Sequence, residues 1–207
     1  MTDVIMRVSC DETVGNYGIN PAYNGTTRRK WGLPMATITY RQATMADADA
    51  IWQIIADAKA VMSIDQNPQW DNGYPSPEII KADIAKGYAY VLLLGDEVVA
   101  TATLWQEKDV NYQRLQGGRW LYPTKRRPYA IIHRMAVSFQ HQGYHLSTAL
   151  FTHLFETARA KGLTYLRIDT HAKNKKMQAI IARRGFTYRG QLAGNRVAYD
   201  LDLDAPK

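Results

Sequence analysis

The feature that most limits how this chain can fold is the stretch of residues 130–170, which reads as strand, turn, helix and strand. Residues 130–137 are a short apolar run with the length of a buried strand. Residues 146–158 repeat apolar side chains at helical spacing, Gly162 is placed to end that helix, and residues 165–170 form a second strand. Because a helical crossover of this kind joins parallel strands, the stretch predicts a parallel pair within a sheet.

Antiparallel strands are predicted on both sides of this unit. Residues 88–94 and 98–105 are apolar strands joined by a turn at Gly95, which is typical of a β-hairpin. Residues 186–189 and 196–203 read as the last two strands. Two helices are expected before the hairpin and one before the last two strands, which gives a single α/β domain. The predicted sheet is mixed and mostly antiparallel, with a central parallel strand pair, and is flanked by helices.

Two short motifs mark where the first two helices begin. Thr44 is followed three residues later by Asp47, which is the spacing of a capping box. Ser76 stands before Pro77, and proline loses no needed N–H at the first helical position. We expect a helix to begin at each place.

Residues 1–35 show neither a strand nor a helix period, so we expect a flexible tail there and one domain over residues 36–207. Cys10 is the one cysteine, which excludes an internal disulfide, and no Cys/His spacing suggests a metal site. No apolar run approaches the ~20 residues that cross a bilayer, and the N-terminus lacks the pattern of a secretory signal. We therefore expect a cytoplasmic protein with no membrane partner and no bound metal.

The formal net charge of +7 favours an anionic partner. Nucleic acid, a phosphorylated cofactor and an acidic peptide all fit that charge. A polar insertion over residues 106–128 contains the basic sequence TKRRP. Charge alone does not decide among these partners.

Residues 142–148 lie where the first strand of the crossover unit turns into its helix. The first turn of a helix leaves backbone N–H groups without partners, and an anion placed there accepts several of them. Gly143 lets the backbone approach closely, and the hydroxyl of Ser147 or Thr148 can cap the turn or donate to an anion. The alternative is an ordinary loop that enters a core helix.

The sequence VSFQHQGYHLSTALF, residues 137–151, resembles motif A of the GNAT superfamily, the acyl-CoA N-acyltransferases. Gln142 and Gly143 match the start of the motif, whereas His145 stands where its first signature glycine is expected. The sequence LRIDTHAKNKKMQAIIARRGFTYRG resembles the family's next strand and helix, with Asn174 at the expected position. The resemblance extends from about residue 38 to the C-terminus and implies a GNAT-like fold.

The resemblance implies that acetyl-CoA lies between the strand that ends at Val137 and the strand that begins near Tyr165. The cofactor-binding residues that it implies are Met135, Ala136, Val137, Gln142, Gly143, Tyr144, His145, Leu146, Ser147, Thr148 and Asn174. The loop amides among them would hold the pyrophosphate. If His145 must adopt a positive φ, it costs on the order of 1 kcal/mol relative to glycine, so we expect weakened cofactor binding.

His133 and His171 are the candidate catalytic residues. His133 and Met135 share one face of their strand, and a histidine beside the thioester could accept the amine proton. The alternative for His133 is a packed histidine bonded to the backbone. His171 could orient Asp169, which lies on the same side of its strand, or it could cap the following turn.

Three aromatic residues lie in loops that border the acceptor pocket in this family: Trp70, Tyr74 and Trp120. The resemblance implies that they bind the acceptor, and the alternative is that they cover the core. The family often places a tyrosine that protonates the leaving thiolate where this chain has Ile181.

The resemblance implies an acetyl-CoA-dependent N-acetyltransferase that moves an acetyl group to a primary amine by direct attack on the thioester, without a metal. The acceptor is a small-molecule amine or a protein amine, and a homodimer stays open. One rival is a non-catalytic acyl-CoA-binding regulatory module, suggested by His145 and Ile181. A second, less favoured rival is a basic nucleic-acid-binding protein, suggested by the net charge.

Overall fold

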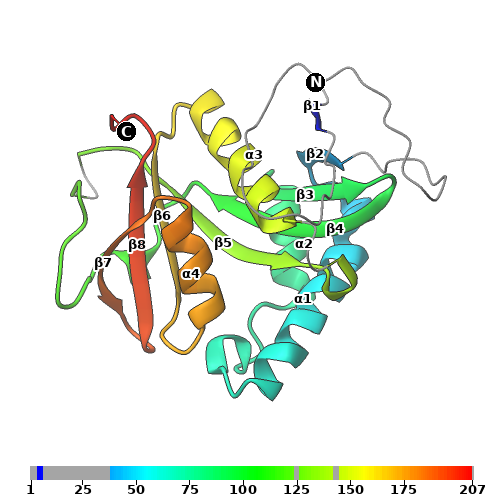
Figure 1. The fold of residues 1–207 in the computed structure, drawn as a ribbon, viewed down its shortest axis with the longest axis horizontal. Helices are drawn as coiled ribbons and strands as arrows, with labels where there is room; N and C mark the ends of the chain where they lie inside the picture. Colours follow the sequence, from blue (N-terminus) through cyan, green and yellow to red (C-terminus); the bar gives the residue numbers. More distant parts are fainter. Residues whose placement is uncertain (1–3, 7–37, 124–125, 142–144, 207) are drawn as a thin grey trace, which may run out of the picture.

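The computed structural model describes residues 4–6, 38–123, 126–141 and 145–206 (Figure 1). The strands are β1 (Val4–Met6), β2 (Ile38–Gln42), β3 (Ala89–Leu94), β4 (Glu97–Trp105), β5 (Ala130–Val137), β6 (Tyr165–His171), β7 (Thr187–Leu192) and β8 (Arg196–Asp202). The α-helices are α1 (Ala48–Ile64), α2 (Pro77–Ala85), α3 (Leu146–Ala160) and α4 (Lys175–Arg183). Short 3-10 helices are η1 (Met45–Asp47), η2 (Pro68–Trp70), η3 (Val110–Tyr112) and η4 (Phe139–His141).

The strands form one sheet in the order β1-β2-β3-β4-β5-β6-β8-β7. All neighbours are antiparallel except β5 and β6, which run parallel and are joined by α3. The predicted mixed α/β sheet with a central parallel pair is therefore confirmed, as is the hairpin of β3 and β4. The turn between those two strands contains Gly95 at a φ of 62°, a left-handed conformation that glycine adopts without strain.

Helices cover both faces of the sheet. Tyr90 and Leu92 of β3 pack into one apolar cluster with α3 and α4, whereas Val91 and Leu93 pack into a second cluster with α1 and α2. Because successive strand residues point to opposite faces, the two clusters lie on opposite sides of the sheet (Figure 1). Burial of each such leucine contributes about 2 kcal/mol, so both layers are needed for stability.

The two predicted helix starts are confirmed. The backbone N–H of Thr44 donates to the Asp47 carboxylate at 2.7 Å, which is the reach-back bond of a capping box. The Ser76 hydroxyl oxygen accepts the N–H of Ile79 at 3.5 Å, at the start of α2. The local sequence therefore fixes both starts.

The predicted tail, residues 1–35, includes one short strand. Its residues Val4–Met6 form β1, which pairs antiparallel with β2 at the edge of the sheet. Residues 7–37 lie outside the described part of the chain. No helix in the described part combines the length and apolar character of a membrane span.

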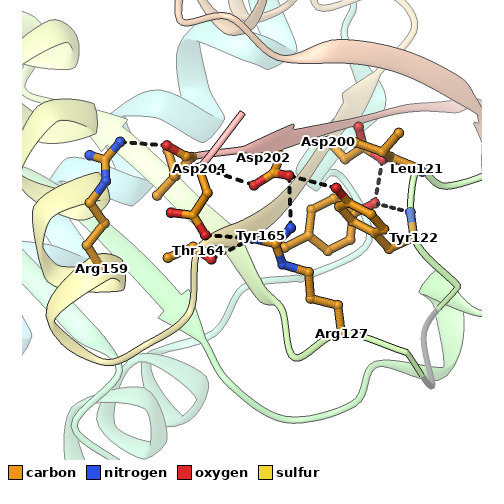
Figure 2. A network of polar contacts seen from close by, with 10 residues as sticks. Leu121, Tyr122, Arg127, Arg159, Thr164, Tyr165, Asp200, Asp202 and Asp204 are labelled. Carbon is orange, nitrogen blue, oxygen red and sulfur yellow. Dashed lines mark hydrogen bonds and ion pairs between the residues drawn. The ribbon is translucent and has the colours of Figure 1, made fainter. Parts of the chain in front are cut away.

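The insertion between β4 and β5 is fastened to the C-terminal strand by polar contacts (Figure 2). Tyr122 Oη donates to the Asp202 carboxylate at 2.8 Å, and Arg127 Nη1 donates to the same oxygen, also at 2.8 Å. The backbone N–H of Leu121 donates to Asp200 Oδ2 at 2.9 Å. Hydrogen bonds to charged groups are stronger than neutral ones, so the insertion is held at several points.

A buried arginine adds to this attachment. Arg167 of β6 is fully buried, and its guanidinium lies 4.2 Å from the ring centroid of Trp120 and 3.9 Å from that of Tyr129. Its Nη2 donates to the carbonyl oxygen of Tyr122 at 3.0 Å. A guanidinium is weakly hydrated and stacks on aromatic faces, which makes this burial tolerable.

Candidate active site

The central parallel strands separate along their length. Residues 130–132 of β5 pair with residues 166–168 of β6, and beyond this register the two strands are not paired with each other. β5 continues to Val137 beside β4, and β6 continues to His171 beside β8. The carboxyl ends of the two central strands therefore open a gap in the middle of the sheet, which is where α/β sheets commonly bind ligands.

A cavity of about 770 Å³ lies at this opening. Its walls come from the loop around η2, the insertion, both central strands and the turn between β7 and β8. We label it the acceptor cavity, after the acceptor pocket that the sequence resemblance predicts. The lining residues that matter below are Tyr74, His133, Arg134, Asp169, His171 and Arg196. A cavity of this size suits a small molecule or a chain end.

A bulge in β5 shapes the wall of the acceptor cavity. Thr101 of β4 lies opposite Ala136 and Thr103 lies opposite His133, so β5 has one extra residue between these pairs. Arg134 lies in the bulge with a φ of 51°. A non-glycine residue in this conformation costs on the order of 1–3 kcal/mol, so it persists only where surrounding contacts fix it.

The side chain of Arg134 makes those contacts. Its Nε donates to Asp83 Oδ2 at 2.6 Å and its Nη2 donates to Asp83 Oδ1 at 2.9 Å. Its Nη1 donates to the hydroxyl of Tyr74. Thr103 donates its hydroxyl to the same aspartate at 2.8 Å, and both charged residues are buried. This closed pair anchors the bulge to α2.

His133 lies on the acceptor cavity, one residue before the bulge. Its Nε2 is 3.6 Å from Asp109 Oδ2, and the exposed fractions of the two side chains are 12% and 21%. The pKa of Asp109 lies below its ordinary value, because the neighbouring His133 side chain and the N–H groups of Asn111 favour the carboxylate. The ring is thus held next to a carboxylate at the cavity wall.

A backbone hydrogen bond selects one tautomer of the neutral His171 ring. Its Nδ1 accepts the backbone N–H of Lys173 at 3.2 Å, so a neutral ring carries its proton on Nε2. Burial lowers its pKa, and the charges of Lys173 and Arg196 lower it further. His171 therefore offers the acceptor cavity a hydrogen-bond donor. Asp169 does not orient it, because its carboxylate accepts from Tyr112 Oη and Arg196 Nε.

Gln69 in η2 links the loop after α1 to the end of β6. Its Oε1 accepts from Thr170 Oγ1 at 2.7 Å, from the N–H of His171 at 3.1 Å and from Asn174 Nδ2 at 3.0 Å. The carbonyl of one side chain therefore holds three groups at the split. No sequence pattern marks Gln69, although it lies next to Trp70, a predicted acceptor-binding residue.

A narrow cavity of about 50 Å³ adjoins the acceptor cavity. Both are lined by His133 and Arg134, and the narrow one adds Met135 and Asn174. Asn174 also caps α4, because its Oδ1 accepts the N–H of Met177 at 3.1 Å. Predicted catalytic and cofactor-binding residues are therefore neighbours at the split.

The predicted phosphate-binding loop is described in part. Gln142, Gly143 and Tyr144 lie outside the described residues. His145 has φ 53° and ψ 24°, the left-handed conformation that glycine favours, and α3 begins at the next residue. The first helical hydrogen bond comes from the N–H of Thr148 to the His145 carbonyl at 2.9 Å. The N–H groups of Leu146 and Ser147 therefore precede it, as in any helix start.

The other predicted residues occupy different surroundings. Trp70 is buried and lines the narrow cavity, and Tyr74 lines both cavities. Ala136 and Val137 pack in the core clusters. Trp120 is behind the acceptor cavity, where it stacks on Tyr112 at 5.7 Å and donates its Nε1 to the Tyr112 carbonyl at 2.9 Å.

Charged residues on the acceptor cavity that were not identified from the sequence include Asp109, Arg134 and Arg196. They come from the insertion, the bulge and the start of β8, which are far apart in the chain. No spacing rule connects them, because only the folded sheet brings them together. Within the described residues, no group of three or more His, Cys, Asp or Glu side chains is arranged to hold a metal ion.

Comparison with known proteins gives a consistent result. Residues 52–186 match the sequence model of the Acetyltransferase (GNAT) family. The structure of an acetyltransferase of the GNAT family from Streptococcus agalactiae 2603 is similar, with a TM-score of 0.74 and 29% identity, over 82% of this chain and 96% of that chain. A comparison with curated protein sequences yields no match.

Two more distant structures share the fold. The PaiA N-acetyltransferase from Thermoplasma acidophilum, solved in complex with coenzyme A, has a TM-score of 0.61 and 12% identity, over 80% of this chain and 98% of that chain. An acetyltransferase from Salmonella typhimurium that modifies the N-terminal serine of ribosomal protein L7/L12 has a TM-score of 0.55 and 17% identity, over 81% and 95%.

Proposed function

The chain belongs to the GNAT acetyltransferase family, and on that premise we propose that it transfers the acetyl group of acetyl-CoA to a primary amine. The observation that supports this proposal is the split between β5 and β6. It joins a narrow cavity, lined by Met135 and Asn174, to a larger one lined by His133 and His171. Two substrates that enter from the two sides would meet at His133.

The proposed acetyl-CoA site uses the narrow cavity and the start of α3. Past Ile132, the backbone of β5 is not paired with β6, so those peptide groups of Met135 to Val137 that point away from β4 are available to the pantetheine arm. The amides of residues 142–148 would hold the pyrophosphate, because the N-terminal turn of α3 presents unpaired N–H groups. Asn174 would lie beside the pantetheine. Bound acetyl-CoA supplies the activated acetyl group.

The proposed reaction is a direct transfer. The amine nitrogen attacks the thioester carbonyl, so that a C–N bond forms, the C–S bond breaks, and the thiolate leaves with the electron pair. His133 accepts the proton that the amine loses. Backbone N–H groups at the bulge stabilise negative charge on the carbonyl oxygen. Solvent protonates the thiolate, since the position of the family's tyrosine is Ile181, which is fully buried in the core.

The acceptor amine would occupy the acceptor cavity, the larger of the two. Tyr74 and Trp70 provide aromatic surface at its junction with the narrow cavity, and His171 donates a hydrogen bond from Nε2. Trp120 supports the wall by packing behind Tyr112. Small amines and protein N-termini both stay within this proposal, since the Salmonella relative acts on a protein N-terminus.

The test is acetyl-CoA turnover with a panel of small amines and peptides, followed by release of the free thiol. We expect thiol release with at least one amine, and a loss on the order of 10²-fold in kcat for His133→Gln. Coenzyme A affinity, measured by calorimetry, should be unchanged in that variant because the phosphate-binding turn is intact.

Other results would favour the rivals. Coenzyme A binding without thiol release for any acceptor would support the regulatory module. Nucleic-acid retention that falls steeply with salt, with no response to coenzyme A, would support the nucleic-acid-binding protein.

A further inference from the structure

We infer that Asp109 is a positioning residue, which holds the Nε2 proton of His133 so that Nδ1 faces the acceptor cavity as the proton acceptor. The inference rests on the proposed function of His133. Asp109 belongs to the insertion between β4 and β5, so the insertion would contribute to catalysis as well as to the wall of the cavity.

The carboxylate of Asp109 is fixed on one side by its own loop. Its Oδ1 accepts the backbone N–H of Asn111 at 2.8 Å and the side-chain Nδ2 of the same residue at 2.9 Å. Its Oδ2 is the oxygen that lies 3.6 Å from His133 Nε2. This distance is longer than that of a hydrogen bond. Catalytic hydrogen bonds are often long in the free protein and shorten when substrate binds.

Two aromatic rings restrict the imidazole. Trp105 meets it edge-on, with ring centroids 6.5 Å apart and planes at 74°, and Tyr112 meets it at 5.7 Å and 87°. Tyr112 is itself fixed by its stack on Trp120 and by its hydrogen bond to Asp169. The ring therefore has little freedom to turn its Nε2 away from the carboxylate.

Two ion pairs lie close to His133. Arg134, the next residue, is paired with Asp83, and Asp169 across the cavity is paired with Arg196. The tyrosine of this environment, Tyr112, has a pKa raised well above its ordinary value by burial and by Asp169, so it stays neutral. Asp109 supplies the carboxylate that lies 3.6 Å from His133 Nε2.

The position of Asp109 depends on how the insertion is attached. The contacts of Leu121, Tyr122 and Arg127 with the C-terminal strand hold the far half of the insertion (Figure 2). An antiparallel bridge between Gln116 and Gln191 holds its middle. These contacts fix a loop that would otherwise move, and a positioning residue needs this rigidity.

The experiment combines nuclear magnetic resonance with kinetics. Protein with 15N-labelled histidine reports the titration midpoint and the tautomer of His133, and His133→Gln identifies its signals. We expect the Nε2–H tautomer in the wild type. In Asp109→Asn the midpoint should fall, with about a tenfold rise in the acid dissociation constant, because the nearby negative charge is lost. The acid limb of kcat/KM should shift by the same amount, and kcat should fall on the order of tenfold.

Two further variants separate positioning from structure. Glu107→Gln removes a carboxylate from the same insertion, one that pairs with Lys86 at 2.9 Å, and should leave midpoint and kcat unchanged. Asp109→Glu keeps the negative charge, so the titration midpoint of His133 should stay close to the wild-type value. This variant serves as the test if Asp109→Asn fails to fold.

Three results would decide the matter. A His133 midpoint that is equal in the wild type and Asp109→Asn would overturn the inference, and so would a wild-type ring with its proton on Nδ1. A wild type that acetylates no amine, but shows the expected midpoint change, would overturn the proposed function and leave the coupling of Asp109 to His133 supported.

Discussion

Replacement of His145 by glycine is the most direct test of the proposed phosphate-binding turn. His145 precedes α3 with a φ of 53°, a conformation that L-residues other than Asn, Asp and His adopt rarely. Glycine adopts it without a clash of Cβ against the backbone. The substitution should therefore relieve strain and leave the N–H groups of the turn in place.

The magnitude follows from two opposing terms. A left-handed conformation costs an L-residue roughly 1–2 kcal/mol. Glycine loses about 0.5–1 kcal/mol more conformational entropy on folding. His145→Gly should therefore stabilise the folded state by about 0–1.5 kcal/mol, which for a chain of this size is at most about 3–6 °C in Tm. His145→Ala keeps the strain, so it should be about 1 kcal/mol less stable than His145→Gly.

The assay is urea denaturation of the two variants and the wild type, with coenzyme A calorimetry on each. A matched control is Ala60→Gly at an exposed position inside α1, where the backbone is right-handed. There glycine should be less stable than alanine by about 1 kcal/mol. The order of glycine and alanine is therefore reversed between the two positions.

Either of two results would refute the reasoning. If His145→Ala were as stable as His145→Gly, the turn would not need a left-handed residue. If coenzyme A affinity collapsed in His145→Gly, where we expect it to be equal or improved, the imidazole itself would bind the ligand and the amides would not suffice.

Three further predictions concern stability. The hydrogen bonds from Arg41 hold the pKa of Asp47 at about 2, below its ordinary 3.8. The stabilisation of the fold by ionised Asp47 is therefore complete above about pH 4 and is lost as pH falls toward 2. Because Arg41 is partly exposed, Asp47→Asn should cost about 1 kcal/mol at pH 7 and little near pH 2, as measured by denaturation at both pH values. Asp83→Asn should lower the free energy of unfolding by about 3–5 kcal/mol, because it leaves Arg134 buried without its anion. Adding Arg134→Met to this variant should restore part of that loss. Equal losses for the single and double variants would contradict this prediction. Gly118→Ala should lower Tm more than Gly117→Ala, since a Cβ on Gly118 would lie 1.8 Å from the Arg189 carbonyl oxygen. Nothing lies within 4 Å of a Cβ on Gly117, so Gly117→Ala should cost only the roughly 1–2 kcal/mol of a left-handed residue at its φ of 67°. The difference should be about 1–3 kcal/mol, and a reversed order would show that the loop moves aside freely.

Local signals predicted the order of elements well because each depends on a few neighbouring residues. The cap at Thr44 and the helix start at Ser76 were both confirmed. The exception is β1, where three residues of the predicted tail join the edge of the sheet. A short edge strand depends on a partner elsewhere in the chain, so no local sequence pattern predicts the strand.

The part of the candidate site that lies on strands could be predicted from the alternation of side chains along them. His133 and Met135 were expected to share a face, and both line the narrow cavity with Asn174. The position of Trp120 was not predictable, because the path of the insertion decides whether a loop aromatic faces a cavity or packs behind one. The same holds for Asp109 and Arg196, which reach the cavity from segments about ninety residues apart.

Periodicity, caps and glycine positions act over a few residues, so the alternation of strands and helices, the parallel pair and the turn before α3 could be predicted from the sequence. Three features could be seen only in the folded domain: the place where β5 and β6 separate, the bulge at Arg134, and the position of Asp109 beside His133. These depend on which strands become neighbours and on which buried charges find partners. Both are settled by the free energy of the whole packed domain.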